Sequence, residues 1–281
     1  MTSPSAVPPT THQMADFYDA LGPLLRMAWG DNFHIGYWEG VSDRSSPQEA
    51  TDRFTDVLTD RLGVEAGCRV LDAGCGIGSP AVRVASLTGA EVWGVTISQQ
   101  QVDQAVELAE RAGLSGRVRF ALRDAMETGY EDGSFDAVLA FESIVHMDRP
   151  RALREWKRVL KPGGRIVLTD VFPVVDETAQ PFNPAFATAR KEEVPDMTSF
   201  VTFDDWPGLV ADAGLELVEL TDVTENIKGT FPRMLDAFLA HRREFEREHG
   251  VTLEEVLDSA KLANQTNPTS SGCLIAVAVK P

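Results

Sequence analysis

The chain has 281 residues, of which 43% are hydrophobic and 25% charged, a composition typical of a folded globular protein with a substantial core. Its net charge of -17 at pH 7 argues against a nucleic-acid-binding surface, because such surfaces need clustered basic residues. Three widely spaced cysteines form no C-x-x-C pair, which speaks against a disulfide framework or a zinc site and favours a reducing, cytoplasmic location.

The first 64 residues precede the regular part of the chain. Residues 1–13 are rich in Pro, Ser and Thr and lack the basic and apolar regions of a signal peptide, so we predict a disordered tail. Residues 14–64 predict two or three helices around an aromatic loop, WGDNFHIGYWEG, at 29–40. We expect these helices to form a lid over a core of residues 65–281. No apolar run reaches the roughly 18 to 20 residues of a membrane span, so no membrane partner is expected.

From residue 68 onward, predicted strands and helices alternate. Apolar runs predict strands at 68–72, 90–96, 117–122, 135–141 and 164–172. Helical periodicity and terminal residues predict helices at 79–88, at 98–113 and between Asp148 and Pro162. This alternation predicts an α/β fold in which helices cover both faces of a parallel sheet, and ligands of such folds bind at the carboxyl ends of the strands.

Two segments after residue 172 interrupt the alternation. Residues 173–202 form a proline-rich insert that is long for a simple connection, and residues 229–266 predict a helical stretch. We expect both segments to wall the side of the site where an acceptor molecule binds. Five aromatic residues would give this side an apolar surface suited to a bulky hydrophobic ligand: Phe172, Phe182, Phe186, Phe200 and Trp206.

The stretch VLDAGCGIGSPAV, at 70–82, places Asp72 at the end of a strand and directly before a glycine loop. Its G-x-G-x-x-A pattern also occurs in dinucleotide-binding folds, which carry a ribose-binding acidic residue about 20 residues further on. This chain has Thr96 there, and the Asp72 carboxylate would repel a pyrophosphate. A cofactor with an amino group, a positively charged sulfur and no phosphate meets neither objection. S-adenosylmethionine is such a cofactor.

The same residues carry a family resemblance. VLDAGCGIGSPAV, FDAVLAFESIVHM and LKPGGRIVLTD resemble, in order and spacing, the motifs of class I S-adenosylmethionine-dependent methyltransferases. NFHIGYWEG, GVTISQQQVDQA and ESIVHM are similar to the O-methyltransferases that tailor bacterial natural products, the rebeccamycin-type sugar 4'-O-methyltransferases among them. The resemblance implies a seven-stranded Rossmann-like α/β sheet with helices on both faces, a helical lid and an antiparallel last strand, here SSGCLIAVAVKP at 270–281.

The resemblance also implies which residues bind the cofactor. Asp72 would reach the methionine ammonium through water, and Gly74 and Gly76 would lie against the methionine. Thr96 stands where many relatives have the ribose-binding acid, so that role passes to Gln101. The other implied contacts are Asp124, Ala125 and Met126 at the adenine, Phe141 at the methionine end, and Tyr18, Tyr37 and Trp38 as aromatic residues that close over the cofactor.

The implied reaction is methyl transfer to a hydroxyl of a bulky, hydrophobic small molecule in antibiotic or other secondary metabolism. The hydroxyl must lose a proton, and a histidine suits that task near neutral pH. We expect His146 to be the base and Asp170 to orient it or share its proton; the related enzymes have two adjacent histidines where this chain has Val145 and His146. No metal is expected, because no Asp-Asn pair follows Asp170. Methylation of carbon on a prenyl, terpene or indole acceptor, cyclisation without methyl transfer, and homo-oligomer formation through the N-terminal helices stay open.

Overall fold

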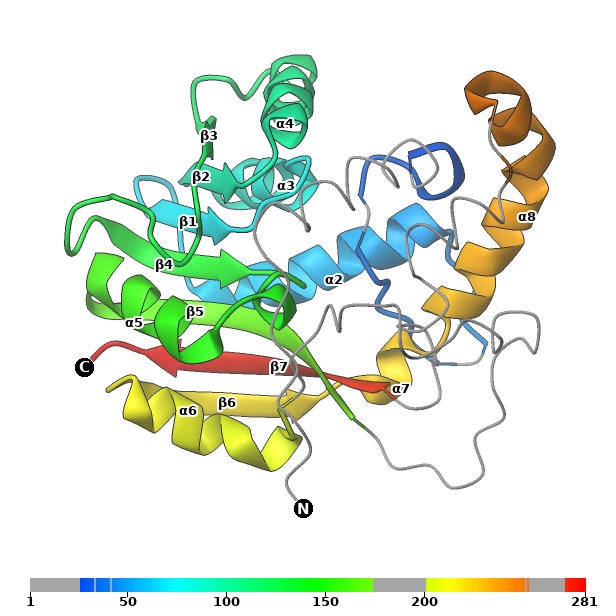
Figure 1. Cartoon of the computed structure of the whole chain (residues 1–281). Coiled ribbons are helices and arrows are strands. Elements are labelled where there is room, and N and C mark those ends of the chain that lie inside the picture. Colours follow the sequence, from blue (N-terminus) through cyan, green and yellow to red (C-terminus); the bar gives the residue numbers. More distant parts are fainter. Residues whose placement is uncertain (1–25, 33, 41, 174–200, 251, 253–270) are drawn as a thin grey trace.

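The sheet is the centre of the molecule. A computed structural model describes residues 26–32, 34–40, 42–173, 201–250, 252 and 271–281. The strands form a seven-stranded sheet in the order β3-β2-β1-β4-β5-β7-β6 (Figure 1), and β7 runs antiparallel to both of its neighbours. This confirms the predicted α/β sheet and its antiparallel last strand. The strands are β1 (Arg69–Ala73), β2 (Glu91–Thr96), β3 (Val118–Leu122), β4 (Phe135–Ala140), β5 (Leu160–Pro173), β6 (Glu216–Asp222) and β7 (Ser271–Val279).

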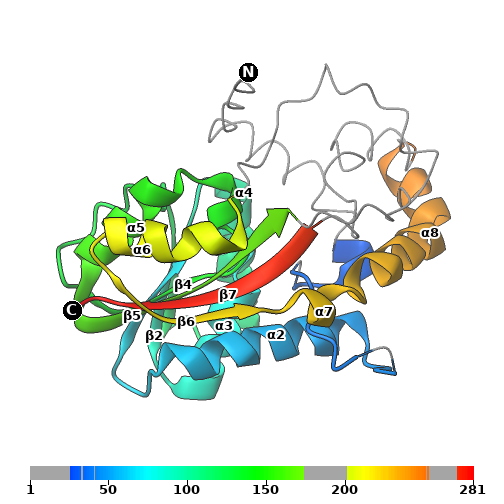
Figure 2. The ribbon, with the colours of Figure 1, turned by 90° about the horizontal axis from the view of Figure 1, so that it is seen from below.

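Helices lie on both faces of the sheet. Figure 2 shows α5 and α6 over one face and α2 and α3 over the other. The short helix η1 follows β4, and α8 extends away from the sheet beyond the carboxyl ends of its central strands (Figure 1). The helices are α2 (Pro47–Leu62), α3 (Ser79–Thr88), α4 (Gln99–Arg111), η1 (Ile144–His146), α5 (Arg149–Val159), η2 (Phe203–Asp205), α6 (Trp206–Asp212), α7 (Thr224–Ile227) and α8 (Thr230–His249).

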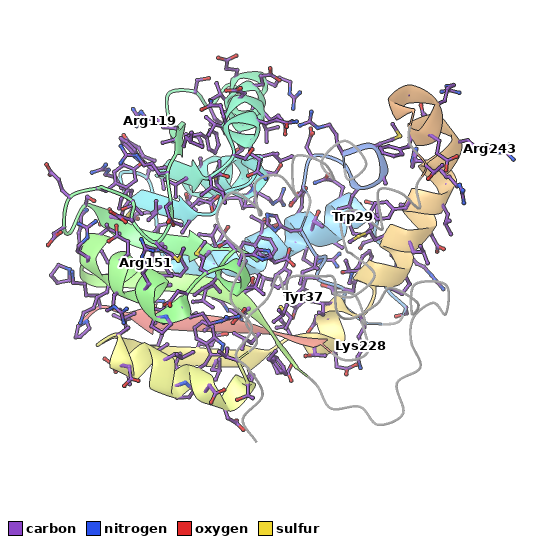
Figure 3. All side chains as sticks on the ribbon, viewed as in Figure 1. Trp29, Tyr37, Arg119, Arg151, Lys228 and Arg243 are labelled. Carbon is purple, nitrogen blue, oxygen red and sulfur yellow. The ribbon has the colours of Figure 1, made fainter. Side chains whose placement is uncertain are left out.

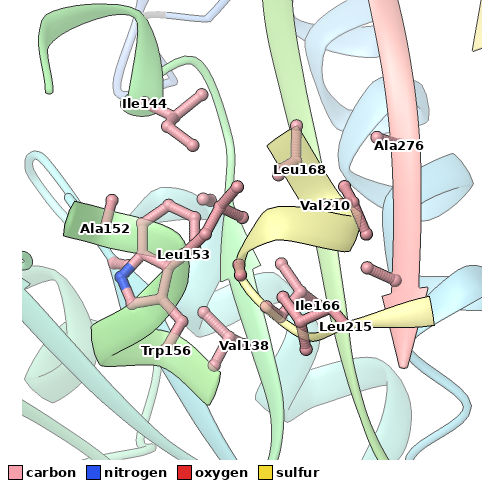
Figure 4. Packing of buried hydrophobic residues seen from close by; sticks show 14 of the residues in the cluster. Val138, Ile144, Ala152, Leu153, Trp156, Ile166, Leu168, Val210, Leu215 and Ala276 are labelled. Carbon is pink, nitrogen blue, oxygen red and sulfur yellow. The ribbon is translucent and has the colours of Figure 1, made fainter. Parts of the chain in front are cut away.

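The core on the α5 side is built around Trp156. Helical spacing places Leu153 and Trp156 on one face of α5, and both are fully buried against Val138 and Ile166 of the sheet (Figure 4). Burial of each such side chain contributes roughly 1.5 to 3 kcal/mol to folding. Val210 of α6 packs against the same cluster. This layer fixes where β4 and β5 end, and so where the residues after them lie.

Part of the expected lid belongs to this packed fold instead. Helix α2, which lies within residues 14–64, carries Phe54, Leu58 and Leu62 four residues apart, and all three are buried against the sheet. Residues at that spacing form an apolar stripe along one side of the helix, and this stripe is buried against the second face of the sheet. The domain boundary expected at residues 64 and 65 therefore falls inside a packed unit. Of the described residues before α2, residues 34–38 reach the carboxyl edge of the sheet.

The last third of the chain was less fully predicted. Neither β6 nor α6 was predicted individually; β6 is an edge strand whose sequence, ELVELTD, mixes charged and apolar residues. The expected helical stretch at 229–266 is helical from Thr230 to His249. Residues 174–200 and 253–270, which hold most of the expected acceptor wall, lie outside the described residues. Over the part of the chain that is described, no helix has the length and apolarity to cross a membrane.

Candidate functional site

The glycine loop after β1 shows why glycine is needed there. Gly74, Gly76 and Gly78 all have a positive φ, a region that other residues rarely adopt. A Cβ on Gly74 would lie 2.5 Å from the Cβ of Ser143, and one on Gly78 would lie 2.6 Å from the ring of Phe120. At Gly76 a Cβ would meet no atom within 4 Å. Two glycines therefore allow close packing, while the third leaves its backbone facing open space where a ligand can approach.

Asp72 is buried at the end of β1 with unused hydrogen-bonding capacity. It is 2% exposed, and its Oδ2 has no hydrogen-bond partner among the described residues. Burial raises the pKa of Asp72 to about 7, and the nearby His34 opposes that rise only in part. A buried, unpaired carboxylate is costly unless a cationic group binds to it. Together with the open backbone of Gly76, it forms a site that fits an ammonium group and no phosphate.

The residues expected at the ribose and the adenine are held by their own chain neighbours. Thr96, at the end of β2, donates from Oγ1 to Oε1 of Gln101 over 2.5 Å, so the two residues expected near the ribose are in contact. Asp124 accepts from the backbone N–H of Met126 over 2.8 Å. The carbonyl of Ala125, which is 4% exposed, accepts from Nε1 of Trp156. These hydrogen bonds fix two turns at the same sheet edge as Asp72.

The residues directly after β4 contact residues 34–38, which we call the N-terminal segment, and hold this segment at the same edge of the sheet. Phe141 is 2% exposed, and the ring of His34 stacks on it with centroids 4.1 Å apart. Nδ1 of His34 lies 2.9 Å from Oε2 of Glu142, and the same oxygen accepts from the backbone N–H of Ile35 over 2.8 Å. Sequence reasoning missed His34 and Glu142 as site residues, although both stand in the motifs NFHIGYWEG and ESIVHM. Their contact joins residues 108 positions apart, and no local pattern reports such a contact.

Glu142 also has an unusual backbone. With φ of 50°, it is the only non-glycine residue in the described part of the chain that has a positive φ. This conformation costs on the order of 1 to 3 kcal/mol and persists only where the surroundings hold it. Here the backbone N–H of Glu142 donates to Oγ1 of Thr169, and the hydroxyl of Ser143 donates to the carbonyl of Ala73. Strained residues of this kind gather at functional sites.

Trp38 makes contacts that the sequence did not predict. Its indole is 2% exposed, donates from Nε1 to Oγ1 of Thr230, and is covered by the guanidinium of Arg233 4.0 Å above the ring. Backbone and side-chain hydrogen bonds link Trp38 to Asn226 in both directions. Trp38 therefore links residues 34–38 to α7 and α8. A contact 192 positions apart in sequence could not be foreseen.

Several other aromatic residues lie in positions that the sequence did not predict. Tyr37 packs its ring 5.6 Å from Phe54, and Figure 3 shows Tyr37 and Trp29 between the sheet and α8. Trp206, expected at the acceptor wall, is fully buried in the core under α6. Phe172 is nearly buried and packs against Phe203. Four further residues expected to face a ligand lie outside the described residues: Tyr18, Phe182, Phe186 and Phe200.

His146 lies where the sequence predicts, in η1 directly after β4. It is half-buried, and its backbone N–H donates to the carbonyl of Ser143 over 3.1 Å. Asp170 lies at the same edge, but its carboxylate binds Arg149, with Oδ2 2.7 Å from Nε and Oδ1 2.9 Å from Nη2. The exposed fractions of the two side chains are 2% for Arg149 and 0% for Asp170. Asp170 is therefore one half of a buried ion pair that ties the start of α5 to β5.

This ion pair predicts an unusual pattern of stabilities. Asp170→Leu alone should lower the free energy of unfolding by about 3 to 5 kcal/mol, because it leaves the Arg149 guanidinium buried without its carboxylate. Arg149→Met combined with Asp170→Leu should recover most of that loss, since a well-packed apolar pair replaces the ions. Urea unfolding of the two variants checks this. A double variant as unstable as the single one would contradict it.

The described ranges contain no group of three or more His, Cys, Asp or Glu side chains placed to hold a metal ion.

Comparison with known proteins gives the site its context. The family model for the methyltransferase domain matches residues 71–168. The chain is 42% identical to methyltransferase GfsG of Streptomyces halstedii, with 81% of each protein covered. It is 38% identical to 27-O-demethylrifamycin SV methyltransferase of Amycolatopsis mediterranei (strain S699), covering 84% of this chain and 85% of that one. The solved structure of the [4+2]-cyclase SpnF is 33% identical, covers 99% of both chains and superposes with a TM-score of 0.82.

These likenesses agree with the geometry at the carboxyl edge of the sheet. The relatives match over most of both lengths, and the matched domain contains the glycine loop, Asp72 and the residues after β4. The chain belongs to the class I S-adenosylmethionine-dependent methyltransferases, uses S-adenosylmethionine as its cofactor and stands close to the O-methyltransferases of natural-product biosynthesis.

Proposed function

We propose that the chain transfers a methyl group to a hydroxyl of a bulky, hydrophobic natural product, with His146 as general base. The observation that carries the proposal is the 38% identity, over more than four fifths of both chains, to an enzyme named for methylating 27-O-demethylrifamycin SV. The position of His146 in η1, which follows β4 at the carboxyl edge of the sheet, supports its role.

The cofactor supplies, when bound, a methyl group on a positively charged sulfur that a nucleophile can displace. The chain's own residues then do four things. Asp72 binds the ammonium, and Thr96 with Gln101 holds the ribose. Phe141 and the N-terminal segment exclude water from the reacting end, which favours a fixed approach of the hydroxyl. An imidazole nitrogen of His146 accepts the hydroxyl proton as the new bond forms.

In this proposal Asp170 acts at a distance from the proton. Its ion pair with Arg149 fixes the first residue of α5, three positions after His146. The pair therefore positions η1 relative to β5, and with it the imidazole of His146. This replaces the direct sharing of a proton that the order of residues suggests.

The proposal is tested by incubating the full chain with S-adenosylmethionine and candidate acceptors. The acceptors are 27-O-demethylrifamycin SV, a panel of macrocyclic and polyketide alcohols, and the metabolite extract of the protein's own organism. We expect one product that has gained a single methyl group, and fragmentation should place it on oxygen. Acceptors whose hydroxyl is already methylated serve as matched controls and should not react. A methyl group found on carbon, or a cyclised product without a new methyl group, would contradict the proposal.

A further inference from the structure

Residues 34–38 cross the edge of the sheet and are held at both ends. At one end, Glu142 contacts the ring of His34 and the backbone of Ile35. At the other end, the backbone N–H of Gly36 donates to Thr230 of α8, and Trp38 is bonded to α7 and α8. The second attachment belongs to the packing of α8. The first ends on a residue of the cofactor site.

The chemistry of that first attachment is directional. Oε2 of Glu142 accepts from the backbone N–H of Ile35, and it pairs with Nδ1 of His34 in the ring tautomer that carries its proton on that nitrogen. The side chains are sheltered, with 17% of His34 and 23% of Glu142 exposed. Hydrogen bonds to a charged group in a sheltered place are among the stronger ones in proteins. The strained backbone of Glu142 aims its carboxylate at the segment.

The position of His34 indicates what its contact with Glu142 does. Its ring lies flat on Phe141, at an interplanar angle of 15°, and it is close enough to Asp72 to act on the pKa of that carboxyl. Asp72 and Phe141 are two of the residues expected at the methionine end of the cofactor, together with Gly74 and Gly76. His34 therefore covers the part of the site that must stay closed while the methyl group is transferred.

We propose that the contact between Glu142 and His34 holds the N-terminal segment closed over the methionine end of the cofactor. This contact would slow the dissociation of the cofactor. Glu142 is in this view a positioning residue: it acts through His34 and Ile35. The strain in its backbone is retained because the left-handed conformation points the carboxylate at the segment. The proposal concerns cofactor retention and does not depend on the identity of the acceptor.

The test uses S-adenosylhomocysteine, the demethylated product of the cofactor, as the probe. Glu142→Ala should raise its dissociation constant about tenfold or more, mainly through a faster dissociation rate, since two hydrogen bonds to a charged group are lost. Hydrogen exchange should quicken at the amide of Ile35. His34→Asn should bind within about threefold of the natural chain, because the Asn amide nitrogen takes the place of Nδ1 and donates to Glu142. His34→Ala should behave like Glu142→Ala.

Glu142→Gly distinguishes a role in holding the N-terminal segment over the cofactor from a role in stabilising the fold. Glycine adopts a positive φ without strain, so this variant without ligand should melt at or above the temperature of the natural chain, yet it should bind the probe about tenfold more weakly. Glu219→Gln is the matched control: Glu219 is similarly sheltered and bonded to Arg61 over 2.9 Å, but lies on β6 away from the site, and it should leave probe binding unchanged. Glycine or alanine variants that bind the probe as tightly as the natural chain, whether or not their melting temperature falls, would overturn the proposal.

Discussion

Replacing His146 by alanine is expected to lower the turnover number by about 10² to 10⁴, the range that a positioned general base contributes. Without the imidazole, the hydroxyl must lose its proton to water as its oxygen attacks, which raises the barrier. The affinity for S-adenosylhomocysteine should stay within about twofold, because a residue that acts on the acceptor's proton adds little to cofactor binding. Single-turnover product formation, measured by mass spectrometry with the acceptor found in the screen above, gives the rate of the chemical step.

The matched control for this experiment is His241→Ala. His241 lies on α8, its side chain is 40% exposed, and it pairs with Glu244. It should leave both the rate and the affinity unchanged. The loss in His146→Ala should also be smaller for a phenolic hydroxyl than for an aliphatic one, since a more acidic proton needs less help to leave. A rate for His146→Ala within a few-fold of the natural chain would remove His146 from the chemistry and leave positioning and water exclusion as the chain's contribution.

Replacing Asp72 by asparagine should weaken cofactor binding and strengthen the ligand-free fold at the same time. A hydrogen bond to a charged group is worth about 1.5 to 3 kcal/mol, so the dissociation constant of S-adenosylhomocysteine should rise about 10- to 100-fold at pH 8. Stability moves the other way. The native state keeps the Asp72 proton up to about pH 7, whereas the unfolded chain releases it near the ordinary aspartate pKa of 3.8.

Between these two pH values the native state binds more protons than the unfolded state, so its stability falls as the pH rises and levels off above pH 7. Asparagine has no charge to desolvate and should remove this loss, which amounts to at most about 4 kcal/mol. Urea unfolding of both ligand-free proteins at pH 5 and pH 8 measures it: the gain should appear at pH 8 and be much smaller at pH 5. A variant that is less stable at pH 8 than the natural chain would contradict this account of Asp72.

The same carboxyl predicts how cofactor affinity depends on pH. Binding an ammonium group needs the ionised form of Asp72, which is the minor form below about pH 7 in the ligand-free protein. The dissociation constant should therefore rise about tenfold for each pH unit below that point, and it should be flat above it. Calorimetry from pH 5.5 to pH 8.5 on the natural chain, with Asp72→Asn as the flat reference, follows this change directly.

What could be predicted from the sequence was mostly local. Helix α3 has the predicted bounds because Pro80 stands in its first turn and Gly78 and Gly89 flank it, all within a dozen residues. Thr96 and Gln101 are five positions apart, so a shared role could be foreseen before their contact was known. The glycine loop is equally local, because its conformational demands act within a few residues.

What the sequence could not show are the contacts between distant parts of the chain. Trp38 was expected over the cofactor, but its surroundings come from α7 and α8. Asp170 was expected beside His146, and Arg149 takes both of its oxygens after the fold brings β5 and the start of α5 together. An aromatic or acidic residue has the same appearance in a sequence whether it faces a ligand or the core. Only the partner, which lies elsewhere in the chain, decides between the two.

The place of β7 in the sheet has a consequence for how the protein is made. β7 is the last strand to leave the ribosome, yet it lies between β5 and β6 and pairs with both along most of their lengths. Until it arrives, β5, which ends up inside the sheet, and β6, which ends up at its edge, both expose backbone groups that β7 later pairs, and such unpaired edges are sites where other chains can add and aggregate. A premature stop that removes β7 should therefore yield an insoluble product that chaperones and proteases must clear, and not a shorter enzyme with a smaller sheet.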